Sequence, residues 1–302
     1  MCGIAGFVND MPIDVKCPVL QRMTDMIAHR GPDSEGHYID EHAALGHRRL
    51  SIIDLGGGQQ PIYNEDGSKV ITFNGEIYNY QTLREELIAA GHTFTTKSDT
   101  EVLLHGYEQW GVDLLQRVRG MFTFVIWDKN KQELFGARDH FGIKPFYYAK
   151  MNGTFMYASE IKSLLRHPDF VKELNAEALK PYMTFQYPAI GETFFKGVYK
   201  LPEGHYFTYR DGKMDIHRYY DEDFREGKQK LGELVNSIDQ TVCDSVKAHQ
   251  IADVEVAPSC RAVSTPATSP PWRVRSTRIR SVSAKARTTN RSRPANWRNC
   301  SN

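Results

Sequence analysis

Along the first 220 residues, apolar side chains follow two patterns, one typical of β-strands and one typical of helices. Short apolar and aromatic runs bounded by Asp, Asn or Gly turns predict β-strands, at residues 3–8, 36–40, 43–46, 69–73, 122–127, 133–137, 146–150 and 154–158. Apolar positions three or four residues apart predict helices, at residues 18–28, 80–90, 100–110, 159–166 and 176–183. A last hairpin is expected at 204–209 and 213–219. Hairpins interrupted by single helices favour an α+β fold with antiparallel sheets.

The pattern changes after residue 219. Residues 220–231 are charged and poor in apolar side chains, which is typical of a linker, and residues 232–249 regain helical spacing. Residues 251–256 are expected to form a strand, so we interpret 220–256 as a linker and the start of a second domain, after a first domain at 2–219.

The last segment, residues 257–302, is basic and of low complexity. It contains nine Arg and one Lys but no Asp or Glu, whereas the residues before it hold 28 Lys and Arg against 37 Asp and Glu. Apolar residues are too sparse there to form a core, so we expect a disordered tail. Its charge leaves open a nucleic-acid-binding arm as the less favoured alternative.

The composition excludes several classes of protein. Of 302 residues, 40% are hydrophobic and 25% charged, which is ordinary for a globular chain. No apolar run approaches the roughly 20 residues of a spanning helix and no secretory signal is present, so we expect a cytoplasmic protein without a membrane partner. The five cysteines and 11 histidines lack metal-ligand spacing, and no metal is expected.

The second residue is the candidate nucleophile. Removal of Met1, which a small residue at position two permits, would leave Cys2 with a thiol and a free α-amine. An α-amine titrates at about 7.7–8.0 and can accept the thiol proton, and the resulting thiolate is a strong nucleophile. The alternative is an ordinary buried free cysteine, and Cys2 alone does not decide between them.

Polar residues in turns between strands are suited to a small zwitterionic substrate with an electrophilic carbonyl. Arg49 can hold an α-carboxylate with two hydrogen bonds, and Glu76 and Asp99 can accept from an α-ammonium. The Asn74 side chain and the Gly75 N–H can donate to an oxyanion. Taken singly, each has a structural alternative: a surface ion pair at Arg49, a helix cap at Asp99 and a turn at Asn74-Gly75.

Six motifs occur in an order that resembles a known family. They are Cys2-Gly3-Ile4, His29-Arg30-Gly31-Pro32-Asp33, Arg49-Leu50-Ser51-Ile52, Phe73-Asn74-Gly75-Glu76-Ile77-Tyr78-Asn79, Ser98-Asp99-Thr100-Glu101 and Gly120-Met121-Phe122. Over residues 2–220 they resemble the class II glutamine amidotransferase domain of glutamine-hydrolysing asparagine synthetases. The resemblance implies an N-terminal-nucleophile hydrolase fold, a four-layer αββα sandwich of two antiparallel sheets.

The resemblance also implies roles for individual residues. Cys2 would attack the amide of L-glutamine, and Asn74 and Gly75 would form the oxyanion hole. Glutamine would be bound by Arg49, Leu50, Ser51, Ile52, Ile53, Asn74, Gly75, Glu76 and Asp99. We interpret four further residues as structural ties rather than ligands: Arg30, Asp33, Arg138 and Asp139. Amidotransferases that make glucosamine phosphate or phosphoribosylamine share the Cys start, but 49–54 and 220–256 are more similar to asparagine synthetases.

The chain departs from this family after Val256. The family continues there with Ser-Gly-Gly-x-Asp-Ser, a loop that cradles the ATP pyrophosphate, whereas residues 257–267 read Ala-Pro-Ser-Cys-Arg-Ala-Val-Ser-Thr-Pro-Ala. Codons chosen for 259–272 give Leu-Ser-Gly-Gly-Val-Asp-Ser-Ser in another frame, so we interpret the tail as out-of-frame translation.

That departure changes what the chain is expected to bind. We expect no cofactor in this chain, because ATP, Mg²⁺ and aspartate would belong to an intact synthetase domain. Besides the basic arm, one alternative is a non-catalytic truncated product that folds poorly. The sequence leaves the oligomeric state, including a homodimer, open.

Overall fold

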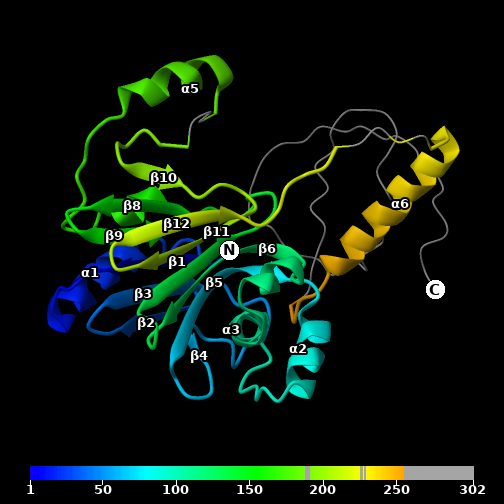
Figure 1. Cartoon of the computed structure of the whole chain (residues 1–302), viewed down its shortest axis with the longest axis horizontal. Helices are drawn as coiled ribbons and strands as arrows, with labels where there is room; N and C mark the ends of the chain where they lie inside the picture. The colour runs from blue at the N-terminus through cyan, green and yellow to red at the C-terminus, as the bar shows by residue number, and fades with distance from the viewer. Residues whose placement is uncertain (188–190, 225–226, 228, 255–302) are drawn as a thin grey trace, which may run out of the picture. The chain divides into compact units, whose positions relative to one another are not determined.

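The computed structural model describes residues 1–187, 191–224, 227 and 229–254 (Figure 1). The chain divides into two units, Met1–Lys228 and Gln229–Asn302. The predicted basic tail at 257–302 lies outside the described residues. Within the described part of the chain, no helix is long and apolar enough to cross a membrane.

The first unit contains two six-stranded sheets, in which every pairing is antiparallel. The first sheet consists, in spatial order, of β10 (Val198–Lys200), β8 (Tyr147–Met151), β9 (Thr154–Ala158), β1 (Gly3–Val8), β3 (Ala43–Arg49) and β2 (Ser34–Ile39). The second consists of β12 (Lys213–Arg218), β11 (His205–Arg210), β7 (Glu133–Arg138), β6 (Gly120–Asp128), β5 (Lys69–Ile77) and β4 (Ile62–Tyr63).

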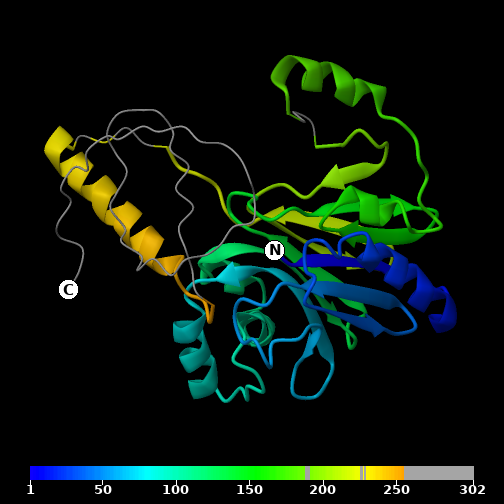
Figure 2. The same cartoon turned by 180° about the vertical axis from the view of Figure 1, so that it is seen from behind.

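Helices cover the outer faces of both sheets (Figures 1 and 2). The first sheet is covered by α1 (Ile13–Asp25) and α4 (Ile161–Leu164), and the second by α3 (Asp99–Trp110), against which α2 (Tyr80–Ala89) packs. The remaining helical segments of this unit are the 3₁₀ turns Gly111–Gln116 and Ala176–Ala178 and the short α5 (Leu179–Phe185). The second unit contains α6 (Leu231–Ala248), in which five apolar residues are exposed: Leu231, Leu234, Val235, Ile238 and Val242.

Side-chain alternation along the strands builds the core. In β1, Ile4 packs between the two sheets with Val125 and Phe207 of the second sheet, whereas Phe7 packs outward against Leu20 of α1. A strand whose two faces are both covered is apolar on both sides. The expected α+β fold with four αββα layers is therefore confirmed.

Several predicted elements need correction. The first helix runs from Ile13 to Asp25 rather than 18–28, because Pro18 lies inside it instead of starting it. The helix expected at 159–166 is confined to Ile161–Leu164. The short strands β4 and β10 were not predicted, since two or three residues are too few to show an alternation of apolar and polar side chains. Residues 251–254 are not a strand, and 255–256 lie outside the described residues.

Two further corrections concern the candidate site. Asn74, Gly75 and Glu76 lie within β5 rather than in a turn after a strand. Ser98, not Asp99, caps α3, because the Ser98 side chain accepts from the Thr100 N–H. The Asp99 carboxylate is thereby left for other contacts.

Candidate active site

Strand geometry gathers the candidate residues at one end of the sheet interface. Ile4, two residues after Cys2, and Val70, four residues before Asn74, both lie in the core between the sheets. Since side chains alternate with a period of two, Cys2 and Asn74 extend from the same interface. The buried His47 of β3 joins the two sheets, because its Nε2–H donates to the Phe73 carbonyl across 2.9 Å.

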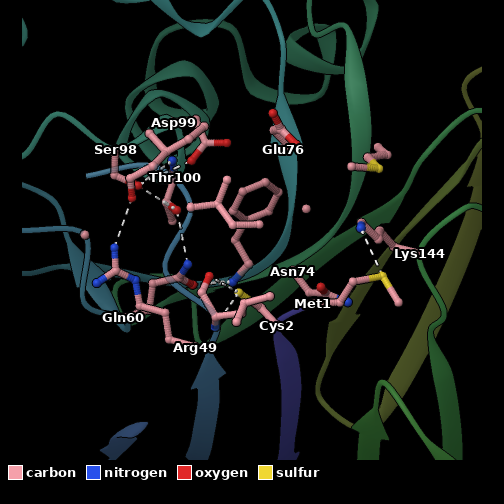
Figure 3. Close-up of a pocket in the computed structure, with 17 residues that line it drawn as sticks. Met1, Cys2, Arg49, Gln60, Asn74, Glu76, Ser98, Asp99, Thr100 and Lys144 are labelled. Atoms are coloured by element: carbon pink, nitrogen blue, oxygen red, sulfur yellow. Dashed lines mark hydrogen bonds between the residues drawn. The ribbon is translucent and has the colours of Figure 1, made fainter. Parts of the chain in front are cut away.

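A cavity of about 100 Å³ lies at this end of the sandwich (Figure 3). Nine of the ten residues proposed from the sequence line it: Cys2, Arg49, Leu50, Ile52, Ile53, Asn74, Gly75, Glu76 and Asp99. The tenth, Ser51, is not among the lining residues, and its N–H donates to Asp33 at 2.8 Å. The structure thus brings together residues from the N-terminus, β3, β5 and α3.

The sulfur of Cys2 is held by the chain that leaves β3. The Leu50 N–H donates to Sγ at 3.3 Å, and Sγ lies 3.5 Å from the Leu50 carbonyl oxygen. Arg30 donates to the Cys2 carbonyl oxygen at 2.9 Å and to Glu160 at 3.0 Å, which agrees with its interpretation as a structural tie. Burial raises the pKa of the Cys2 thiol, and the Leu50 hydrogen bond opposes that effect. The resting sulfur is therefore a thiol that needs a base.

Asn74 and Gly75 place two donors beside the cavity, and the Asn74 side chain has no hydrogen-bond partner among the described residues. Asn74 is 1% exposed, yet neither its Nδ2 nor its Oδ1 has a hydrogen-bond partner among the described residues. Phe122, opposite Gly75 on β6, directs its N–H and C=O to Asp139. The Gly75 N–H therefore points away from β6. A Cβ at Gly75 would lie 2.3 Å from the Met121 carbonyl oxygen, so only glycine fits.

The buried guanidinium of Arg49 shapes the loop over the cavity. Its Nη2 donates to the carbonyl oxygens of Ile53 at 3.0 Å and Asp54 at 2.6 Å. A Cβ at Gly58 would lie 2.7 Å from the same nitrogen, so the loop folds tightly around this side chain. Because Arg carries five donors, the guanidinium keeps donors for a ligand.

Two carboxyl groups lie across the cavity from Cys2 (Figure 3). Asp99 accepts from the Ile77 N–H at 3.0 Å, and burial raises its pKa to about 7. Burial also raises the pKa of Glu76, whose Oε1 is buried without a hydrogen-bond partner among the described residues. A ligand ammonium would supply the missing counter-charge to both.

The lining residues that were not proposed from the sequence include two with polar side chains outside the six motifs, Gln60 and Lys144. Lys144 is 4% exposed, forms no ion pair among the described residues, and lies 3.5 Å from the Met1 sulfur through Nζ. The backbone of Lys144 is fixed because its N–H donates to Asp139 and its carbonyl oxygen accepts from Arg138. The sequence signal that could have indicated Lys144 is the group of polar residues at the end of β7, of which we interpreted Arg138 and Asp139 only as structural.

The sequence of this chain is similar to those of known proteins. Residues 1–220 match the family model described as a glutamine amidotransferase domain. The chain is 44% identical over 260 residues to asparagine synthetase (glutamine-hydrolysing) 1 of Bacillus subtilis strain 168, covering 85% of this chain and 41% of that protein. It is 35% identical over 263 residues to asparagine synthetase 3 of the same organism, covering 85% and 42%. The chain spans about two fifths of the length of these relatives.

A solved structure shares the fold. The glutamine phosphoribosylpyrophosphate amidotransferase of B. subtilis superimposes with a TM-score of 0.54 at 18% identity, covering 73% of this chain and 50% of that one. The likeness to this structure is one of fold. By its match over residues 1–220, the chain belongs to the glutamine amidotransferase domain family.

Proposed function

We propose that the chain hydrolyses L-glutamine to glutamate and ammonia through Cys2, after removal of Met1. The observation that carries this proposal is one cavity lined by Cys2, the buried Arg49 guanidinium and buried polar atoms that have no hydrogen-bond partner in the described part of the chain. Arg49 would bind the α-carboxylate of glutamine, and Asp99 with Glu76 the α-ammonium. These contacts would direct the side-chain amide toward Cys2.

The reaction would then proceed through a thioester. The α-amine of Cys2 takes the thiol proton, and the sulfur attacks the amide carbon of glutamine. The negative charge that develops on the amide oxygen is stabilised by the Asn74 side chain and the Gly75 N–H. Collapse of this intermediate breaks the C–N bond, and ammonia leaves with the proton returned from the amine. Water, deprotonated by the same amine, hydrolyses the thioester to glutamate.

The relatives suggest a wider role. They are named as glutamine-hydrolysing asparagine synthetases, and the similarity supports a glutaminase of that type. In such a protein the ammonia would be used to amidate aspartate with ATP and Mg²⁺. Because residues 257–267 lack the Ser-Gly-Gly-x-Asp-Ser loop, we propose that the 302-residue chain releases ammonia without forming asparagine.

One assay separates these activities. Purified protein is incubated with L-glutamine, aspartate, ATP and Mg²⁺, and glutamate, ammonia and asparagine are quantified together. The proposal expects equal amounts of glutamate and ammonia, abolished in Cys2→Ala, with no asparagine. Asparagine formation would overturn the restriction to glutamine hydrolysis, and full glutaminase activity in Cys2→Ala would overturn the mechanism.

A further inference from the structure

Four potential metal ligands converge where α3 packs beside the turn between β4 and β5. The ligand atoms of Glu65, His92, His105 and Glu108, which we call the His–Glu cluster, all lie within 4.8 Å of one another. Glu65 lies in the turn between β4 and β5, His92 follows α2, and the other two are one helical turn apart on α3. We propose that the His–Glu cluster binds one Zn²⁺ ion, or a similar first-row divalent ion, that joins these three segments.

The distances within the cluster are close to those that an ion requires. Nδ1 of His105 lies 2.9 Å from Glu108 Oε2 and 3.5 Å from Glu65 Oε2. Nδ1 of His92 lies 3.6 Å from Glu65 Oε1 and 4.0 Å from Glu108 Oε2. Zinc bonds of about 2.0–2.2 Å in a tetrahedron separate the ligand atoms by about 3.3–3.6 Å. The atoms of the cluster lie up to 4.8 Å apart, so side-chain shifts of up to about 1 Å would complete the coordination.

The His92 imidazole has the tautomer that coordination through Nδ1 needs, whereas Nδ1–H of His105 donates to Glu108 and a bound ion would have to displace that proton. Nε2 of His92 lies 3.1 Å from the Gln109 side-chain oxygen, so Nε2 carries the proton and Nδ1 offers its lone pair. Nε2 of His105 faces the Glu101 carboxylate at 3.6 Å. Carbonyl and carboxylate partners on the distal nitrogen are the usual outer contacts of zinc-bound histidines.

The carboxylates are also oriented. Asn64 donates to Glu108 Oε1 at 2.7 Å, and Lys69 Nζ lies 3.4 Å from the same oxygen, which leaves Oε2 for the ion. The Thr93 N–H donates to Glu65 Oε1 at 3.1 Å. Once the His105 proton is displaced, two neutral imidazoles and two carboxylates would balance a divalent charge, and a mixed nitrogen–oxygen set suits Zn²⁺ better than Ca²⁺ or Mg²⁺.

The sequence expectation of no metal rested on the spacing of Cys and His alone. Here the ligands come from positions 65, 92, 105 and 108, and two of them are glutamates. Only the fold brings them together. Their number leaves no ligand position open for substrate in a tetrahedral site, so the ion would be structural. It would fix α3, which begins at Asp99, against the hairpin that continues into β5.

Zinc titration of the purified full chain by calorimetry tests this proposal. Chelator-treated protein is titrated in the Cys2→Ala background, which removes a competing thiol ligand, and Co²⁺ is used in parallel for its visible absorption. We expect one Zn²⁺ per chain, at least tenfold weaker binding in His92→Gln and in Glu65→Gln, and a Co²⁺ spectrum typical of four-coordination. Gln109→Ala should weaken binding about tenfold through the outer contact.

The exposed His217 of β12 provides the matched control. His217→Gln should bind Zn²⁺ as the parent protein does, and circular dichroism of each variant confirms that it is folded. The proposal is overturned if the folded parent chain binds no Zn²⁺, or if His92→Gln and Glu65→Gln bind as tightly as His217→Gln. Either result would leave the four residues as an ion-pair cluster. Neither result bears on glutamine hydrolysis.

Discussion

The N–H of Leu50 donates to the sulfur of Cys2 across 3.3 Å, and the Leu50 carbonyl oxygen lies 3.5 Å from the same atom. Leu50 directly follows β3, which pairs with β1 in register from Gly3 opposite Arg48. The position of the nucleophile is therefore set by the pairing of two central strands. A reactive group held by a rigid sheet needs little reorganisation when substrate binds.

The first prediction concerns the nucleophile. Cys2→Ala should lower the glutaminase kcat by ~10³-fold or more, because loss of a covalent nucleophile removes the whole reaction path. Cys17→Ala, at an exposed cysteine of α1, serves as the control and should retain full activity. The measurement is glutamate release under saturating L-glutamine. Equal activity in the two variants would contradict the role of Cys2.

The second prediction concerns the oxyanion. Asn74→Ala should reduce kcat by ~10²–10³-fold with a much smaller change in KM, because its donor acts on charge that develops only in the transition state. Asn130→Ala, in the exposed turn after β6, is the control. Steady-state kinetics on folded protein provides both constants. A large rise in KM with unchanged kcat would instead assign Asn74 to ground-state binding.

The third prediction uses two adjacent arginines on opposite faces of β3. Arg49 lines the cavity, whereas Arg48 pairs with Glu35 at 2.5 Å on the outside. Arg49→Lys should raise KM about tenfold or more, since an ammonium cannot reproduce the two parallel bonds of a guanidinium to a carboxylate. Arg48→Lys should leave KM unchanged. Similar KM values for both variants would contradict carboxylate binding by Arg49.

The fourth prediction concerns pH. Burial raises the pKa of Asp99 from 3.8 to about 7. Because the folded-state pKa is the higher one, the stabilising contribution of the protonated carboxyl is complete below pH 4 and is lost as the pH rises toward 7. Urea unfolding of Cys2→Ala should therefore show the free energy of unfolding falling over this range relative to Cys2→Ala/Asp99→Asn.

Bound L-glutamine should reduce this loss of stability at neutral pH. L-glutamine, which Cys2→Ala cannot hydrolyse, would place its ammonium beside Asp99 and favour the ionised carboxylate. We expect glutamine to stabilise Cys2→Ala more at pH 7.5 than at pH 5, with no such difference in the variant that also carries Asp99→Asn. Equal stabilisation at both pH values in Cys2→Ala would contradict contact between Asp99 and the ammonium.

The fifth prediction concerns Lys144, whose pKa is lowered by burial. Burial lowers the pKa of the Met1 amine, and the Lys144 charge lowers it further; we expect the same effect on the Cys2 amine once Met1 is removed. Lys144→Met should therefore shift the acidic limb of the kcat/KM profile to higher pH, because both the amine and the thiol would lose a neighbouring cation. Lys144→Arg keeps the charge and should restore the profile. A lower kcat/KM with an unshifted limb in Lys144→Met would indicate a merely structural side chain.

The sequence was sufficient to predict the architecture where strands were long and turns were clear. The Asn152-Gly153 turn between β8 and β9 has positive φ at both residues, as its sequence suggested. In contrast, the start of α1 was predicted too late, at residue 18. Pro18 lies inside the helix, which begins at Ile13, and a proline does not mark the start of a helix that tolerates it in its interior. The short β4 and β10 depend on neighbouring strands rather than on their own pattern.

The candidate site was predicted from motifs more completely than from local structure. Residue types at Cys2, Arg49 and Asn74 suggested their chemistry, but Asn74 was expected in a turn and lies in β5. Lys144 was missed because we interpreted the polar residues before it, Arg138 and Asp139, only as structural. Its burial and the position of its Nζ beside the Met1 sulfur arise from contacts across the sandwich, which a linear pattern does not contain.

The central claim is that the α-amine of Cys2 acts as the base for its own thiol. The most direct test is the intact mass of the active protein, measured on the same fraction that releases ammonia from L-glutamine. The account predicts that active protein lacks Met1 and begins at Cys2. Ammonia release at full rate by protein that retains Met1 would contradict it.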